Sequence, residues 1–356
     1  MKDTKYRVLE LFAGAGGLAL GLHEAGFETV GLVELDKHAS NTLKLNKPDW
    51  PVFNVNIIDF NHNLRDYISV EETVDLVSGG FPCQPFSYAG AGLGLADTRG
   101  TLFFEFAEII KKLNPKVFLA ENVKGLSTHD NGRTLKIILK VFDEIGYNVN
   151  CKILNANDYD VAQKRERLVM VGIRKDLPNI YKYPLPSKKK LVLRDVLQDV
   201  PISEGARYPE HKRKILELVP PGGCWRDLPD ELAREYMAGS YHLGGGKTGM
   251  ARRISWDEAS LTLTCSPAQK QTERCHPDET RPFTVREYAR IQTFPDSWIF
   301  QGGLSNQYKQ IGNAVPVNLA KKIGLSIIQY LDSYHKYNGE SINANVITQI
   351  QPELYF

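Results

Sequence analysis

A cysteine between two prolines is the residue of this chain whose chemistry is most evident. Cys83 stands in the segment Gly79 to Ser87, GGFPCQPFS, directly after the apolar strand pattern of residues 74–78. Open α/β folds bind ligands and do chemistry outside the carboxyl ends of their strands. Core cysteines usually lie inside apolar runs, whereas this one is flanked by Pro82 and Pro85. Cys83 is therefore predicted to be a nucleophile.

Two further segments carry groups that could serve such a nucleophile. Glu121-Asn122-Val123 follows the strand pattern of residues 116–120, and a carboxyl group there could act as a general acid if burial raises its pKa. Gln163, Arg165 and Arg167 alternate, so within one extended segment they would share a face. A thiol of pKa about 8.5 needs cationic neighbours to ionise at neutral pH, and Arg165 is the candidate. Structural salt bridges are the alternative for these arginines.

A glycine-rich turn, Phe12-Ala-Gly14-Ala-Gly16-Gly17, separates the first strand pattern from the first helix pattern. Glycines let a ligand approach the backbone, and the helix N-terminus offers free N–H groups. With Ala19 and Glu34 the turn also fits a dinucleotide fingerprint in which Glu34 accepts the ribose hydroxyls. A nicotinamide enzyme and a glycine turn without a ligand both remain open on this segment alone.

Taken together, these motifs resemble those of the cytosine-C5 methyltransferase family. The family has a Pro-Cys nucleophile loop, Glu-Asn-Val, Gln-x-Arg-x-Arg and a late Gly-Asn-Ala-Val-Pro, in that order. In this chain the motifs are Pro82-Cys83, Glu121 to Val123, Gln163 to Arg167, and Gly312 to Pro316. The resemblance as a whole extends from about Val8 to about Leu325. The resemblance implies a DNA (cytosine-5-)methyltransferase of the bacterial restriction–modification kind.

The family uses S-adenosylmethionine, which becomes S-adenosylhomocysteine, and the resemblance implies the same cofactor here. The aspartate expected to bond the adenine, Asp59, lacks the glycine that usually precedes it. The implied cofactor residues are Phe12, Gly14, Gly16, Gly17, Glu34, Asp59, Pro82, Asn313 and Val315.

The resemblance also implies the reaction. The thiolate of Cys83 would add to C6 of cytosine, which makes C5 nucleophilic toward a methyl donor. Glu121 would act at N3, and Arg165 would reach O2 and the thiol. Because a stacked base is out of reach, the cytosine must be flipped out of the duplex. The loop from Ser87 to Arg99 could close over it.

Double-stranded DNA is the implied partner, and residues 191–281 lie where the family keeps its target-recognition domain. Arg286 and Arg290 are interpreted as scaffold. One alternative is a tRNA-methylating relative, whose typical Cys-Phe-Thr tripeptide is absent here. The other is an inactive reader, whose hallmark would be a lost nucleophile, whereas Cys83, Glu121 and Arg165 are all present. The implied DNA-binding residues are Ser87, Arg99, Arg167, Arg252, Arg253, Gln269 and Arg274.

The elements that must position these residues follow an α/β pattern. Up to about residue 174, strand-like and amphipathic segments alternate, which predicts a doubly wound, mostly parallel sheet of the methyltransferase type. Expected strands are 7–12, 29–33, 74–78 and 117–120, with helices at 102–113 and 135–145, and Asp36 as an N-cap. The expected domains are a catalytic domain 1–185, a smaller irregular target-recognition domain 186–302, a returning segment 303–335 and a polar tail 336–356.

Composition is typical of a globular cytoplasmic protein. The chain has 356 residues, of which 42% are hydrophobic, and a net charge of +2. No signal-peptide core or membrane-length apolar run is present. Five cysteines without a CxxC pair predict neither a disulfide framework nor a metal site. We expect a monomer, linked in function but not by contact to a cognate restriction endonuclease.

Overall fold

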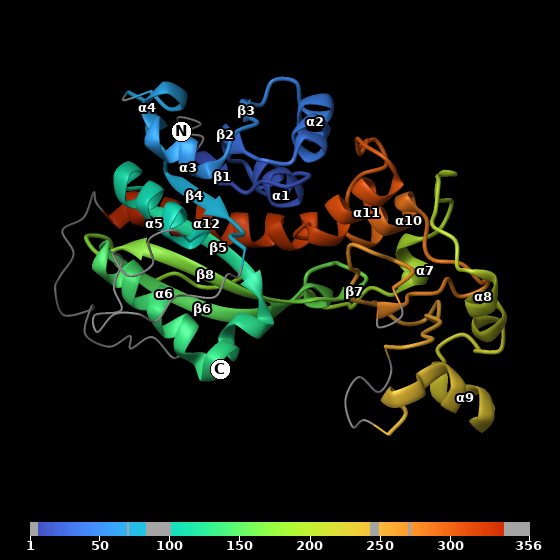
Figure 1. Cartoon of the computed structure of the whole chain (residues 1–356). Coiled ribbons are helices and arrows are strands. Elements are labelled where there is room, and N and C mark those ends of the chain that lie inside the picture. The colour runs from blue at the N-terminus through green and yellow to red at the C-terminus, as the bar shows by residue number, and fades with distance from the viewer. Residues whose placement is uncertain (1–5, 70, 83–100, 243–248, 270–271, 338–356) are drawn as a thin grey trace. The chain divides into compact units, whose positions relative to one another are not determined.

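The computed structural model describes residues 6–69, 71–82, 101–242, 249–269 and 272–337 (Figure 1). By its contacts the chain divides into two compact units. The first comprises Met1–Asn155, Glu166–Pro186 and Leu319–Phe356, and the second comprises Ala156–Arg165 and Ser187–Asn318. No helix among the described residues is long and apolar enough to cross a membrane.

A seven-stranded sheet forms the centre of the first unit, in the order β3-β2-β1-β4-β5-β8-β6. All neighbours from β3 to β5 are parallel, whereas β8 runs antiparallel to both β5 and β6. The predicted α/β fold with a mostly parallel sheet is therefore confirmed. The strands are β1 (Arg7–Leu11), β2 (Glu28–Val33), β3 (Val52–Phe53), β4 (Leu76–Gly79), β5 (Val117–Val123), β6 (Tyr147–Asn155) and β8 (Glu166–Arg174).

Helices cover both faces of this sheet, because the side chains of β1 that point to either face are buried. Leu9 and Leu11 join the core cluster that α5 and α6 share, whereas Glu10 points to the other face, where the backbone of Ala19 on α1 lies. Gly324 of α12 packs against Ala25 of α1. The helices of this unit are α1 (Gly17–Ala25), α2 (Lys37–Asn46), α3 (Ile57–His62), α4 (Leu64–Tyr67), α5 (Leu102–Leu113), α6 (Arg133–Glu144), the short η2 (Lys124–Ser127) and η3 (His129–Gly132), and α12 (Val317–Tyr337) from Leu319 on.

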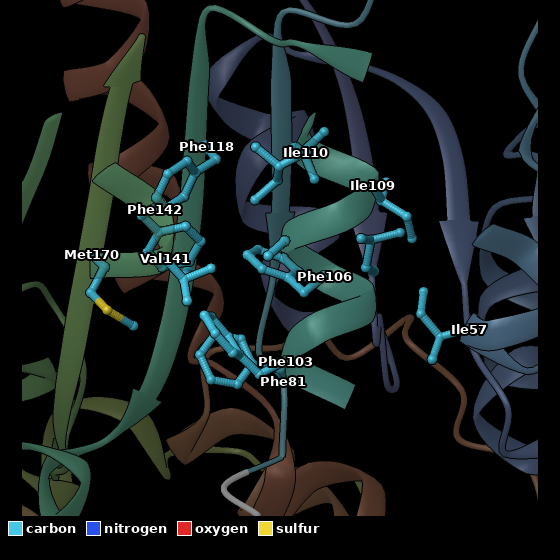
Figure 2. Packing of buried hydrophobic residues seen from close by; sticks show 14 of the residues in the cluster. Ile57, Phe81, Phe103, Phe106, Ile109, Ile110, Phe118, Val141, Phe142 and Met170 are labelled. Atoms are coloured by element: carbon cyan, nitrogen blue, oxygen red, sulfur yellow. The ribbon is translucent and has the colours of Figure 1, made fainter. Parts of the chain in front are cut away.

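Aromatic packing fixes α5 and α6 on β4 and β5 (Figure 2). The ring centroids of Phe118 and Phe142 are 4.3 Å apart, and those of Phe81 and Phe103 are 5.1 Å apart. Burying one such ring contributes roughly 1.5–3 kcal/mol. Phe81 is 3% exposed, so the chain is anchored in the core two residues before Cys83.

The second unit contains little regular structure, and its only sheet within the described residues is the parallel pair of β7 (Gln163–Lys164) and β9 (Ser260–Leu261). A small core forms around Tyr208, Leu216, Tyr236 and Cys275. Its helices are η4 (Ala156–Asp158), α7 (Leu193–Val196), α8 (Glu210–Glu217), η5 (Trp225–Asp227), α9 (Asp230–Met237), η6 (Ala238–Ser240), α10 (Val285–Ile291) and α11 (Leu304–Asn313).

Gly79 provides a test of the close packing at the end of β4. A Cβ at this position would lie 2.4 Å from the carbonyl oxygen of Leu11 in the neighbouring strand β1. We expect Gly79→Ala to lower the free energy of unfolding by about 1–3 kcal/mol, because backbone in a paired strand cannot move aside. Urea denaturation measures this. Gly125→Ala is the control, since its Cβ would meet nothing within 4 Å, and equal stability of the two variants would contradict the expectation.

Candidate active site

The chain that leads to the predicted nucleophile leaves the sheet at the end of β4. Cys83 itself, with Ser87 and Arg99, lies outside the described residues. Pro82 is exposed, and Phe81 is buried. The carbonyl oxygen of Phe81 accepts a hydrogen bond of 2.9 Å from Nδ2 of Asn122. This bond ties the chain that leads into the predicted nucleophile loop to β5.

Glu121 is held near the end of β5 by an ion pair with Arg167. The Nε atom of Arg167 lies 2.7 Å from Oε1 of Glu121, and these side chains are only 12% and 14% exposed. A Cβ on Gly80 would lie 3.1 Å from Oε2 of Glu121, so the carboxylate also faces the chain just after β4. The structure thus brings Glu121, Arg167 and the backbone that precedes Cys83 together at one edge of the sheet.

The glycine-rich turn and Glu34 form a second arrangement in the first unit. Oε2 of Glu34 accepts a hydrogen bond of 2.7 Å from the backbone N–H of Gly14, and Oε1 accepts one of 2.7 Å from that of Asp36. Gly14 has φ +55°, and nothing lies within 4 Å of where its Cβ would be. Gly16 is the left-handed N-cap of α1, which begins at Gly17. The backbone of the turn therefore borders open space beside an oriented carboxylate.

The residues around Glu34 fit a nucleoside. A carboxylate has lone pairs beyond those used by two N–H groups, so Glu34 can still accept ribose hydroxyls. Phe12, partly buried with φ +58°, begins the turn. Asp59 is exposed in the first turn of α3, one turn after Asn56, which caps that helix through a bond to Ile58 N–H. These contacts fit the cofactor that the motifs imply.

Two residues near this turn were missed by the sequence reasoning. Leu35 is 66% exposed directly after Glu34, and such an apolar side chain offers a surface for a flat ring. The sequence signal that could have identified Leu35 is its position directly after Glu34, the predicted ribose acceptor. Glu10 is 2% exposed, and its Oε2 atom has no hydrogen-bond partner. Burial, and then the charge of Glu34, raise the pKa of Glu10 well above its ordinary value, against an opposing backbone N–H from Ala19.

Arg165 belongs to the second unit, where it joins two segments of backbone. It is 1% exposed and donates hydrogen bonds to the carbonyl oxygens of Leu263, at 3.1 Å, and Gly312, at 2.8 Å. Gln163 accepts from the N–H of Leu263 at 2.9 Å and donates to Gln292 at 3.0 Å. Arg167, by contrast, lies in β8 of the first unit. The three alternating residues therefore do not form one continuous strand, because β7 ends and β8 begins on either side of Arg165.

The expected DNA-binding arginines of the second unit are mostly engaged within it. Arg253 is 4% exposed and donates to the carbonyl oxygens of Leu216, Val219 and His276. Arg252 pairs with Glu258 at 2.6 Å.

The other two expected DNA-binding residues of this unit differ in exposure. Arg274 is 6% exposed, and burial lowers its pKa. Gln269 is exposed. DNA contact therefore stays a prediction for all four residues. Of the four, Gln269 is the one with an exposed side chain.

The late motif lies at the end of α11. Asn313 is exposed at the last position of this helix, and Val315 is 8% exposed. Their predicted cofactor role remains a prediction. Among the described residues, no group of three or more His, Cys, Asp or Glu side chains could hold a metal ion.

Glu10 should make stability depend on pH. Because its pKa is raised in the folded state, its contribution to stability is present below the ordinary glutamate pKa of about 4.3 and is lost as pH rises through the folded-state pKa. We expect Glu10→Gln, which cannot ionise, to gain in Tm relative to the parent protein as pH rises from 5 to 9. Thermal unfolding followed by circular dichroism measures this. The exposed Glu28→Gln is the control, and a constant Tm difference for Glu10→Gln would contradict the expectation.

Similarity to known proteins extends over most of the chain. The profile of the family described as C-5 cytosine-specific DNA methylase matches residues 6–329. The chain is 59% identical over 338 residues to the Type II methyltransferase M.Sau96I of Staphylococcus aureus, covering 94% of this chain and 78% of that protein. It is 57% identical over 346 residues to the Type II methyltransferase M.Eco47II of Escherichia coli, covering 94% and 82%.

Solved structures share the fold at lower identity. A prophage-encoded protein of Escherichia coli gives a TM-score of 0.67 at 23% identity, covering 92% of this chain and 100% of that one. The Dnmt2 methyltransferase of S. pombe gives 0.57 at 19% identity, covering 93% and 99%. With a family match over most of its length and relatives of such high identity, the chain belongs to the C-5 cytosine-specific DNA methylase family.

Proposed function

We propose that this protein methylates C5 of a flipped-out cytosine in a short duplex DNA site, through a covalent bond between Cys83 and C6 of the base. The family supports cytosine in DNA as the target, and the naming of its relatives as Type II methyltransferases supports a restriction–modification role. Methylation would then protect host DNA from a cognate endonuclease. S-adenosylmethionine, implied by family and fold, would supply the methyl group as an electrophile on a sulfonium.

The covalent step solves a problem of reactivity. C5 of cytosine is a weak nucleophile, and addition of the Cys83 thiolate to C6 moves electron density to C5 and N3. Glu121 would share or donate a proton at N3 as negative charge develops. After methyl transfer, a base removes the C5 proton, the C5–C6 double bond returns and the thiolate leaves.

The observation that carries this proposal is the placement of Glu121. Its carboxylate is paired with Arg167 and lies against Gly80. Two residues of chain span at most about 7 Å, and Phe81 is anchored by Asn122, so the loop that carries Cys83 starts at the same edge. Arg167 is the described guanidinium that contacts Glu121. The catalytic role of Arg165 rests on the motif. Its described hydrogen bonds go to the carbonyl oxygens of Leu263 and Gly312, which they hold together.

Base flipping follows from the reaction. Addition to C6 requires access to the face of the ring, which stacking in a duplex blocks. For site recognition we propose the exposed Gln269 as a reader of base edges, since an amide pairs bidentately with adenine. Methylation of random-sequence DNA, followed by bisulfite sequencing, identifies both the site and the target cytosine.

A mechanism-based trap tests the covalent step. On DNA with 5-fluorocytosine at the target, methyl transfer leaves no proton on C5, so the thiolate cannot be expelled. We expect an adduct that survives denaturing electrophoresis, requires S-adenosylmethionine and maps to a peptide containing Cys83. Cys83→Ser should lose both the adduct and turnover, because a serine hydroxyl ionises far less readily than a thiol.

The outcomes of the trap separate the alternatives. Trapping on 5-fluorocytosine RNA but not on DNA would favour a tRNA-methylating enzyme. Methylation by Cys83→Ser within tenfold of the parent rate would contradict the covalent assignment.

The ion pair of Glu121 can be tested through Arg167. We expect Arg167→Met to lower the rate of methyl transfer by about 100-fold, the range over which a positioned acid acts. Cofactor affinity should stay within twofold in calorimetry. Lys124→Met is the matched control, because its pair with Glu166 is about half exposed, and such surface pairs contribute little. Equal rates in both variants would show that Arg167 does not serve Glu121.

A further inference from the structure

A tight backbone contact in the second unit joins the segment after β9 to the end of α11. A Cβ on Gly312 would lie 2.6 Å from the carbonyl group of Thr264 and 2.7 Å from the backbone nitrogen of Cys265. Arg165 adds hydrogen bonds to the carbonyl oxygens of Leu263 and Gly312. Close packing of this kind leaves no room for a side chain between the two segments. Residues that flank the contact are therefore held in register with one another.

One side-chain bond flanks this contact. The Sγ atom of Cys265 lies 2.9 Å from Oδ1 of Asn313. Partial burial raises the pKa of the Cys265 thiol, although the charges of Arg165 and Lys309 oppose this. The thiol therefore keeps its proton at neutral pH, and a protonated thiol is a hydrogen-bond donor. Its bond distinguishes the two ends of the Asn313 amide, because only the oxygen can accept.

We propose that Cys265 is a positioning residue, whose thiol holds Oδ1 of Asn313 so that the amide presents its Nδ2 group to a ligand. The inference rests on the proposed function and on the contact with S-adenosylmethionine that the motif resemblance implies for Asn313. With Oδ1 bonded to the thiol, the Nδ2 group is directed away from Cys265 as a donor. An acceptor on the ligand, such as a carboxylate, is the chemistry that this donor fits.

The test compares two substitutions of Cys265. Cys265→Ala removes the donor, whereas Cys265→Ser keeps a hydroxyl that can donate to the same oxygen. We expect the Kd for S-adenosylhomocysteine, measured by calorimetry, to rise about five- to tenfold in Cys265→Ala, as for loss of one ordinary hydrogen bond. In Cys265→Ser it should stay within twofold. At saturating S-adenosylmethionine, kcat should be unchanged in both, since the effect lies in binding.

The exposure of Cys265 gives a second measurement that is independent of catalysis. Alkylation of Cys265 by iodoacetamide, followed by peptide mass spectrometry, should slow severalfold when S-adenosylhomocysteine is bound. Cys151→Ala is the matched control, because this half-buried thiol lies in the edge strand β6, which β4, β5 and β8 separate from β1 and the glycine-rich turn. It should leave the Kd unchanged.

The outcomes distinguish this inference from the function on which it rests. If Asn313→Ala weakens cofactor binding and Cys265→Ala does not, the positioning role is overturned. If Asn313→Ala binds the cofactor normally while the parent protein methylates DNA, the role of Asn313 and this inference both fail, and the proposed function stands. If Cys265→Ala and Cys265→Ser weaken cofactor binding equally, the packing of the Cys265 side chain, and not the hydrogen that it donates, supports binding, and the inference is overturned.

Discussion

The direction of β8 is the constraint on which the candidate site depends. Because β8 runs against β5, its first residues lie beside the last residues of β5, and the register pairs Val123 with Arg167 and Glu121 with Val169. Glu121 and Arg167 are thus diagonal neighbours on one face, a separation that long side chains span. Their ion pair of 2.7 Å follows from this register. A parallel strand at this position would place its first residue at the opposite edge of the sheet.

Much of the first unit could be predicted because its signals are local. The helix expected at 102–113 is α5 with the same bounds, and Asp36 caps α2 by accepting from His38 and Ala39. Strands buried between helices are apolar runs, which the sequence shows directly. The boundaries shifted where pairing extended a strand, as in β5, which continues through Glu121-Asn122-Val123 because β8 pairs with all three residues. Such an extension depends on a partner distant in the sequence.

The parts of the site that could not be predicted depend on contacts between distant segments. The alternation of Gln163, Arg165 and Arg167 indicates one shared face only if the strand is continuous, and the chain instead passes between two sheets at Arg165. Glu10 resembles an ordinary strand residue by its position, and its burial becomes evident only when α1 is packed over it. In both cases local periodicity is correct, and the tertiary environment decides the role.

The second unit shows why its basic residues are poor indicators of DNA contact by themselves. Its described residues form only the short β7–β9 pair, yet buried carbonyl groups need partners. A guanidinium has five N–H donors in a fixed plane, so one buried arginine can serve several carbonyl groups at once. Arg253 does this for Leu216, Val219 and His276, and Arg165 does it for Leu263 and Gly312. Arginines used in this way hold irregular loops in place. In the proposed function they would influence DNA binding only through the loops that they position, whereas accessible side chains such as Gln269 would make the contact itself.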